Sequence, residues 1–582
     1  MDPVKPYIER IEEINDLSDM TNYLLDNDGM NFLLDYPVSF CTANPIVDRD
    51  YYTVYLEVSS RIFLTSSDCY INIDETSQTG QSGQISKEVA DRYAYYNLPK
   101  LGYSNEETKD LLAKCYEYET LLADNMMTIK EFSTLSSADA LDNKYSFDEL
   151  KDLEGNYPLT EILEHFGLDK SNNYTVTQPK YIKAVAKIYS DENLEIMKAY
   201  YIVHTAVSSL SFLDRNAFNE LKTVDEGFGK AEEETGPVSN DDDNDEDKTL
   251  EEKEMSYQID YFIDRYMDEV RNEIYYATYC SKAQKDGIEE IVSEVLDYYC
   301  EMIEGEDWLS DETKQGAIKK MKNMAIHAVY PDEFEDFMGL NFDEDSNLVD
   351  KIKKIREFNL YENADLVNMP IDRTMWENQL SPLTVNAYYL AESNSINILP
   401  GIIAGDFLFD SDGSKEANMG EIGTIVGHEK THSIDTYGAD YDELGRRQNW
   451  WSGVDKNTFS RKTDILKNFY SALSPYPGAV TYNGKNVQSE AIADMGGLKG
   501  MLGIAKKDSG FDYDIFFRAY VRTWCEKYPY QYVVSAAQGD PHPIDFLRVN
   551  VVLQQFDEFN ETYGISEGDG MYLPTEDRVI VW

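Results

Sequence analysis

GTIVGHEKTHSID, residues 423–435, predicts both the fold and the chemistry of this chain. The apolar residues before His428 favour a buried helix. In a helix, His428 and His432 lie on one face, about 5–6 Å apart. Two imidazoles at that spacing can both reach one Zn²⁺ ion. Glu429 would project beside the metal, where a carboxylate can take a proton from water. The alternative interpretation is an accidental histidine pair on a surface helix.

A third ligand would decide between these interpretations, because a catalytic zinc site needs three protein ligands and one open position. The stretch EAIAD, residues 490–494, places Glu490 and Asp494 on one helix face. Glu490 could bind the metal, while Asp494 could accept the free ring N–H of a ligating histidine. Asp435 could do the same for His432, three residues before it. By itself this pair is weak evidence, since the chain has 109 acidic residues and most such pairs are solvated.

The rest of the chain divides into a helical part and a mixed part. Capping boxes begin at Ser104 and Ser146, Ser310 is the expected N-cap of a helix over 308–324, and 257–304 reads as an amphipathic helix pair. From about Ser381 short β-type runs alternate with helices and glycine-rich joints. These patterns predict a mainly α (α+β) protein with a boundary near residue 375.

One acidic segment, residues 225–254, interrupts the helical part. Its SNDDDNDEDK run could be a calcium-binding loop that starts at Asp241. Such a loop needs glycine at its sixth position, where Glu246 stands. We therefore expect a disordered, solvated surface loop.

Composition excludes several classes of partner. The chain has 582 residues and a net charge of −57, so nucleic acid and anionic membrane surfaces are not expected partners. The most apolar stretch, 200–213, is too short to span a membrane and is expected to be a core helix. No signal peptide is expected at the start. A disulfide framework or zinc finger is not expected either, because no metal-type spacing relates the cysteines at 41, 69, 115, 280, 300 and 525.

Several motifs, taken in order, resemble the neprilysin and endothelin-converting-enzyme family of zinc metallopeptidases, which includes bacterial oligopeptidase O. The resemblance is dense over about 375–582 and thinner upstream. It rests on Val385-Asn386-Ala387-Tyr388-Tyr389, Gly427-His428-Glu429 to His432 and Asp435, Trp450-Trp451, Glu490 to Asp494, His542 with Arg548, and Val581-Trp582.

The resemblance implies a role for each matching residue. His428, His432 and Glu490 would bind one Zn²⁺ per chain, and Glu429 would be the general base that activates the zinc-bound water. Asp435 and Asp494 would orient the two histidines. His542 would stabilise the developing oxyanion. The substrate-binding residues would be Asn386 and Ala387 on an edge strand, Arg548, Ile425 and Trp524, the last two in a pocket also assigned Thr424, Ile403 and Phe407.

The implied fold has two lobes: a helical cap, residues 1–374, and a thermolysin-like catalytic lobe, residues 375–582. The lobes would enclose a central cavity, and helices at about 255–330 would pack with the catalytic lobe. The implied activity is endopeptidase hydrolysis of oligopeptides on the amino side of hydrophobic residues. The family's N-terminal start is missing, so a leader or anchor is expected to be absent from this chain.

Two other functions remain open. One is a peptide-binding protein of the same fold with weakened catalysis. Its support is Lys430, which stands where the family carries an apolar residue, and this ammonium should reach solvent or a carboxylate. The other is an acidic cell-surface interaction protein with a purely structural zinc, although such sites usually have four protein ligands.

The remaining expectations concern partners and location. Oligopeptides are the expected partners, with no membrane-spanning segment, and a monomer is expected. The resemblance implies an extracellular or cell-envelope location, with the cytoplasm as the alternative. His165, His204 and His327 lie outside every motif and are assigned no role.

Overall fold

The computed structural model describes most of the chain. The described residues are 3–26, 36–44, 50–59, 78–128, 131, 141–208, 262–263, 266–334, 337, 339–343, 345–376, 380–475, 480–579 and 581–582. The predicted acidic loop, 225–254, lies outside them. The five described cysteines are free thiols. None of the described helices is both long and apolar enough to cross a membrane.

The chain folds into two compact units, neither of which is continuous in sequence. Unit 1 contains residues 1–268 and 335–371, and unit 2 contains 269–334 and 372–582. The chain therefore crosses between the units after residues 268, 334 and 371. The segment 269–334 belongs with the second half of the chain, because its helices pack in unit 2.

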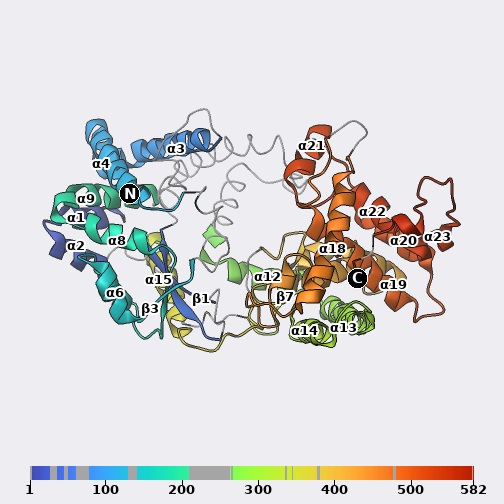
Figure 1. The fold of residues 1–582 in the computed structure, drawn as a ribbon. Helices are drawn as coiled ribbons and strands as arrows, with labels where there is room; N and C mark the ends of the chain where they lie inside the picture. Colours follow the sequence, from blue (N-terminus) through green and yellow to red (C-terminus); the bar gives the residue numbers. More distant parts are fainter. Residues whose placement is uncertain are drawn as a thin grey trace. The chain divides into compact units, whose positions relative to one another are not determined.

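Unit 1 is mostly helical and surrounds a small sheet (Figure 1). Its helices are α1 (Lys5–Glu12), α2 (Leu17–Leu24), α3 (Gln78–Leu101), α4 (Asn105–Ala123), α6 (Phe147–Glu154), α7 (Leu159–His165), α8 (Pro179–Ile188), α9 (Leu194–Ser208) and α15 (Leu348–Asp365). Its strands are β1 (Val38–Ala43), β2 (Thr53–Val58), β3 (Asn143–Tyr145) and β4 (Tyr174–Val176). Among the described residues the order is β1-β2-β4-β3, in which only β2 and β4 pair in parallel.

Local capping explains where several of these helices begin. The capping boxes predicted at Ser104 and Ser146 are both confirmed. In each, the serine hydroxyl accepts from the backbone N–H of the N3 glutamate, and the glutamate carboxylate accepts from the backbone N–H of the serine. Helix α9 is buried along most of its length, as expected for a core helix. The core of unit 1 forms where α4 packs along α9, with α3 and α8 beside them.

Unit 2 joins helices from two distant parts of the chain. In Figure 1, α13 and α14 lie beside α18 and α19 although more than a hundred residues separate them. Its helices are α12 (Asp268–Tyr279), α13 (Lys282–Gly305), α14 (Asp311–Lys322), α16 (Lys415–Asn418), the π-helix η8 (Met419–Gly423), α17 (Thr424–His432), α18 (Gly453–Ser471), α19 (Gln488–Ala505), α20 (Tyr513–Thr523), α21 (Tyr530–Gly539), α22 (Asp545–Leu553) and α23 (Asp557–Tyr563).

The sheet of unit 2 is small and has a defined edge. It contains β5 (Ala325–Ala328), β6 (Ala387–Leu390) and β7 (Ser395–Ile398) in the order β5-β7-β6. β6 and β7 form an antiparallel hairpin in which Ala387 faces Ile398, whereas β5 runs parallel to β7. β6 is thus an edge strand among the described strands, as the sequence predicted for Ala387.

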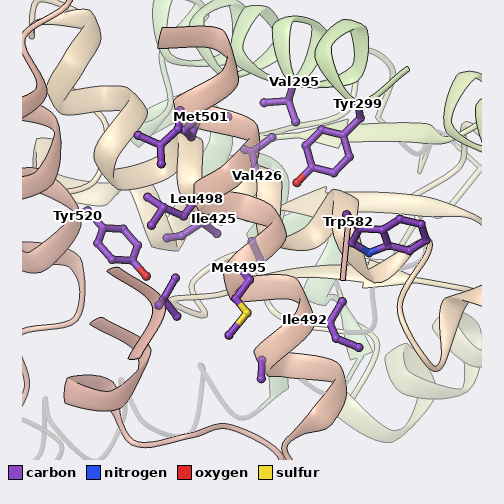
Figure 2. Packing of buried hydrophobic residues seen from close by; sticks show 14 of the residues in the cluster. Val295, Tyr299, Ile425, Val426, Ile492, Met495, Leu498, Met501, Tyr520 and Trp582 are labelled. Carbon is purple, nitrogen blue, oxygen red and sulfur yellow. The ribbon is translucent and has the colours of Figure 1, made fainter. Parts of the chain in front are cut away.

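The buried core of unit 2 centres on the contact between α17 and α19 (Figure 2). Figure 2 shows Val426 of α17, Leu498 of α19 and Tyr299 of α13 converging. Tyr299 donates its hydroxyl hydrogen to the carbonyl of Gly427 at 2.8 Å, or shares it with Thr431 Oγ1 at 2.8 Å. Trp451 is buried in the same core against Phe459, so its role is packing.

Glycines allow α17 and α19 to approach backbone to backbone. A Cβ on Gly497 would lie 2.5 Å from the carbonyl oxygen of Thr424 and 2.8 Å from the backbone nitrogen of His428. A Cβ on Gly427 would in turn lie 2.8 Å from the Cα of Gly497. This close approach places the N-terminal half of α19 directly beside the histidines of α17.

Gly497→Ala is therefore expected to destabilise the protein by about 1–3 kcal/mol, because the added methyl group must push two helices apart. Urea unfolding monitored by circular dichroism measures the change. Gly453→Ala is the matched control, since no atom lies within 4 Å of the position of its added Cβ. Equal stability of the two variants would contradict the close contact.

Candidate metal and catalytic site

His428 and His432 project from α17 toward a single point, as their spacing predicts. Their Nε2 atoms are 3.0 Å apart. Glu490, at the start of α19, places its Oε2 atom 3.1 Å from Nε2 of His428 and 3.5 Å from Nε2 of His432. Residues from two helices therefore present three ligand atoms within a few ångströms of each other.

Both histidine rings are held from behind by carboxylates. Nδ1 of His428 lies 2.8 Å from Oδ1 of Asp494, and Nδ1 of His432 lies 2.7 Å from Oδ2 of Asp435. Because a carboxylate accepts, each Nδ1–H donates, and each Nε2 presents a lone pair to the other ligands.

The supporting carboxylates are themselves fixed in place. Arg548 of α22 donates to both oxygens of Asp494, at 2.7 and 2.9 Å. Burial alone would raise the pKa of Asp494, but Arg548 and His428 lower it to about 2. Asp435 accepts from the backbone amides of Tyr437 and Gly438, each at 2.7 Å, and from the hydroxyl of Ser489.

The acidic groups at the centre differ in their electrostatics. Burial would raise the pKa of Glu490, but in the metal-free site hydrogen bonds from His428, His432 and His542, donated when their Nε2 atoms are protonated, lower it well below its usual range. Glu429 is also buried, and burial raises its pKa despite the neighbouring histidines. Glu429 is thus a stronger base than an exposed carboxylate.

A cavity of about 660 Å³ opens directly onto this centre. Five of the predicted substrate-binding residues line it: Asn386, Ala387, Ile425, Trp524 and Arg548. His428, Glu429, His432, Glu490 and His542 line it too. The structure thus brings the predicted ligands, base and substrate-binding residues together in unit 2.

Three residues that the sequence assigned to the side-chain pocket do not line this cavity. Thr424 is buried, with its hydroxyl donating to carbonyls of the preceding turn. Ile403 lines a separate cavity of about 180 Å³ beside Tyr275. Phe407 is exposed and lies under the guanidinium of Arg522, 5.5 Å away.

His542 lies in the loop just before α22. Its Nδ1 is 2.9 Å from Asp540, and its Nε2 points toward Oε2 of Glu490 at 3.2 Å. Burial alone would lower the pKa of His542, but its pairing with Glu490 raises it. A half-exposed imidazole is thereby held at the edge of the ligand group.

The guanidinium of Arg548 is held by both stacking and hydrogen bonds. Its guanidinium stacks 3.7 Å from the ring centre of Trp524 and forms its two hydrogen bonds to Asp494. Arg548 therefore links the cavity wall to Asp494, the carboxylate that orients His428.

One wall of the same cavity is acidic and was not expected from the motifs. Glu526, Asp540 and Asp545 line it on the side of Trp524. Tyr528 donates to Asp545 at 2.9 Å and also contacts Glu526, and burial raises the pKa of Asp545. These three acidic residues lie between Trp524 and Arg548 in the sequence, and this position could have indicated that they line the same cavity.

Lys430 does not reach solvent or a carboxylate, so that expectation was wrong. Its side chain is fully buried, and its Nζ has no hydrogen-bond partner among the described residues. Because α13, α19 and the sheet pack against α17, the face of α17 opposite the ligands is covered by protein. Burial lowers the pKa of Lys430 to about 8.

Lys430→Met is therefore expected to stabilise the protein by about 1–3 kcal/mol, since it removes a buried donor without a partner while keeping the side-chain length. The unfolding free energy in urea measures the gain. Lys322→Met, at an exposed position of α14, is the control and should change little. A Lys430→Met variant less stable than the parent chain would contradict the interpretation.

Comparisons with known proteins agree with this arrangement. Two models of peptidase family M13 match residues 1–331 and 386–579, which together make up most of the chain. The neutral endopeptidase of Lactococcus lactis subsp. lactis is 24% identical over 581 residues, covering 100% of this chain and 87% of that protein. The neutral endopeptidase of Lactobacillus helveticus is 24% identical over 497 residues, covering 85% and 72%.

Solved structures show the same fold. The open state of the zinc metalloprotease Zmp1 of Mycobacterium tuberculosis matches with a TM-score of 0.82 at 22% identity, covering 100% of this chain and 87% of that one. PepO of Lactobacillus rhamnosis matches with a TM-score of 0.74 at 21% identity, covering 99% and 86%. Since the family models cover more than half of its length, this chain belongs to peptidase family M13, the neprilysin-like zinc metalloendopeptidases.

Proposed function

We propose that this chain hydrolyses oligopeptides on the amino side of hydrophobic residues, with one Zn²⁺ held by His428, His432 and Glu490. The observation that carries the proposal is the convergence of three ligand atoms beside the buried carboxylate of Glu429, on an open cavity.

The three ligand atoms are all acceptors, so a metal ion between them would be more favourable than their direct contact. With both Nδ1–H groups engaged by carboxylates, the two Nε2 lone pairs face each other at 3.0 Å. Oε2 of Glu490 lies 3.1 Å and 3.5 Å from these two Nε2 atoms. A cation at this point would satisfy all three acceptors, and two imidazoles with one carboxylate are a common catalytic zinc set.

Zinc, when bound, supplies a Lewis acid that polarises water and the substrate carbonyl. The chain's own residues perform the remaining work. Glu429 would take a proton from the attacking water and pass it to the leaving amine, since its burial makes it a competent base. His542 would donate a hydrogen bond to the developing oxyanion, an effect usually worth about 3–4 kcal/mol.

The substrate backbone would bind to the edge of β6. Asn386 and Ala387 line the cavity at the exposed edge of the sheet, where an extended peptide can add as a strand. Arg548 would contact the carbonyl just after the scissile bond. Its hydrogen bonds to Asp494 hold the guanidinium at the cavity wall in a fixed orientation.

The apolar part of the cavity supports a preference for hydrophobic residues. Ile402, Leu408, Ile425 and Trp524 line it next to the ligand group. An apolar side chain after the scissile bond could be removed from water against them.

A series of fluorogenic peptides that differ only in the residue after the scissile bond tests this specificity. We expect kcat/KM for Leu or Phe to exceed that for Gly by about tenfold or more. Ile425→Ala should reduce the preference for Leu and Phe while cleavage of the Gly peptide changes less. Preferred cleavage before Lys or Arg would contradict the proposal and assign specificity to Glu526, Asp540 and Asp545.

We further propose that the chain acts as a monomer, outside the cell or in the cell envelope, as the family resemblance implies. Size-exclusion chromatography with light scattering measures the oligomeric state, and fractionation of source cells measures the location. A stable dimer or recovery from the cytoplasm would contradict the respective proposal.

A further inference from the structure

A second group of metal-ligand side chains lies in unit 1, far along the chain from His428 and His432. Cys115 and Glu119 stand one turn apart on α4, and His204 stands on α9. Their candidate ligand atoms all lie within 4.8 Å of one another. Oε1 of Glu119 is 2.7 Å from Nε2 of His204.

The group is buried in an apolar core. Cys115 and Glu119 are 0% exposed, and the side chain of His204 is 12% exposed. The surrounding core residues include Leu112, Tyr118, Leu122, Tyr200 and Val203. A carboxylate at such a position is costly unless an opposite charge or strong donors compensate it.

The helix geometry brings these three side chains together. Residues four apart share one face of α4, so Cys115 and Glu119 both face α9, which packs along α4. The ring of Tyr200, one turn before His204, lies against the imidazole with ring centres 4.0 Å apart. This packing fixes the orientation of the ring and helps to direct Nε2 toward Glu119.

A thiol, an imidazole and a carboxylate together favour a particular kind of cation. Sulfur and nitrogen ligands suit zinc, whereas Mg²⁺ and Ca²⁺ require oxygen ligands. With zinc–ligand bonds of about 2.0–2.3 Å, neighbouring ligand atoms in a tetrahedral site lie roughly 3.3–3.7 Å apart. The present separations need only small side-chain movements to reach that range.

We propose that Cys115, Glu119 and His204 form a second zinc site, which links α4 to α9 and stabilises unit 1, with a water molecule as the fourth ligand of the tetrahedron in place of the usual fourth protein ligand. On binding, the thiol of Cys115 loses its proton to solvent, and the ion replaces the hydrogen bond between Glu119 and His204. The divalent charge then balances the thiolate and the carboxylate.

The alternative is a buried, hydrogen-bonded Glu119–His204 pair with a thiol beside it. That arrangement satisfies the carboxylate without any metal. The two structures differ in one property that can be measured directly, namely a bond between the metal and sulfur.

Cobalt titration of the metal-free, full-length protein provides the test, because Co²⁺ bound to thiolate gives a sulfur-to-metal charge-transfer band in the near ultraviolet. The family site contributes nitrogen and oxygen ligands alone, so it gives no such band. We expect two Co²⁺ ions per chain and a thiolate band that grows with one of them. Cys115→Ser should lose the band and one ion.

Cys525→Ser, which alters an exposed cysteine, is the matched control and should keep both ions and the band. Glu119→Gln keeps the side-chain shape and should weaken binding of the second ion. A protein that binds Co²⁺ without a thiolate band, or a band that persists in the Cys115→Ser protein, would overturn the proposal.

X-ray absorption of the zinc-loaded parent chain covers the case in which the variants fail to fold. A zinc–sulfur distance of about 2.3 Å, with one sulfur for two zinc ions, is the expected result. A shell of nitrogen and oxygen alone would rule out the second site. Neither experiment depends on peptidase activity, so its outcome is independent of the proposed function.

Discussion

Glu429→Gln is expected to lower kcat by about 10²–10⁴-fold, because general-base catalysis by a positioned side chain usually contributes that much. The amide has almost the shape of the carboxylate but cannot accept a proton from water. Glu429 is buried beside the two histidines, and burial raises its pKa, both of which suit a base at neutral pH.

The diagnostic feature of this variant is that activity falls while the metal stays. His428, His432 and Glu490 are unchanged in the Glu429→Gln protein, so its zinc content should equal that of the parent chain. Steady-state cleavage of a fluorogenic peptide and elemental analysis measure the two quantities. A variant that retains more than about a tenth of the parent activity would remove Glu429 from the role of base.

Glu490→Gln is expected to abolish both zinc retention and activity. This change removes the negative charge that faces both Nε2 atoms, at 3.1 and 3.5 Å. Without it, the ion keeps two neutral imidazoles as protein ligands, fewer than the three of a catalytic zinc site. After dialysis against a weak chelator, the variant should retain much less zinc in unit 2 than the parent chain.

Glu526→Gln is the control for loss of a cavity carboxylate. Glu526 lines the same cavity but contacts Tyr528 and none of the ligands. Its variant should retain zinc and cleave peptides, with changes confined to specificity. Retention of tightly bound zinc by the Glu490→Gln protein would show that another group supplies the third ligand.

Much of the site could be predicted because its information is local in sequence. The four-residue spacing of His428 and His432, and of Glu490 and Asp494, defines helix faces before any tertiary structure is known. The carboxylate behind His432 also follows from a short spacing, because Asp435 is three residues away, whereas Asp494 reaches His428 from α19. The glycines of the second motif were visible in sequence, but their contact across α17 and α19 was not, because it depends on how two helices cross.

The features that sequence analysis missed depend on tertiary contacts. Whether Lys430 reaches solvent depends on α13, which is more than a hundred residues away in sequence and covers that face of α17. The grouping of Cys115 with His204 arises because α4 and α9 pack together, and no spacing within either helix reveals it.

Peptide cleavage before and after metal removal tests the central claim most directly. The parent protein is assayed with a quenched fluorescent peptide carrying Phe or Leu after the scissile bond, then stripped with a chelator and supplied with Zn²⁺ or Mg²⁺. We predict cleavage that disappears on stripping and returns with Zn²⁺ but not with Mg²⁺. Cleavage that survives complete metal removal, or a zinc-loaded protein that cleaves no peptide of the series, would contradict the assignment of His428, His432 and Glu490 as a catalytic zinc centre.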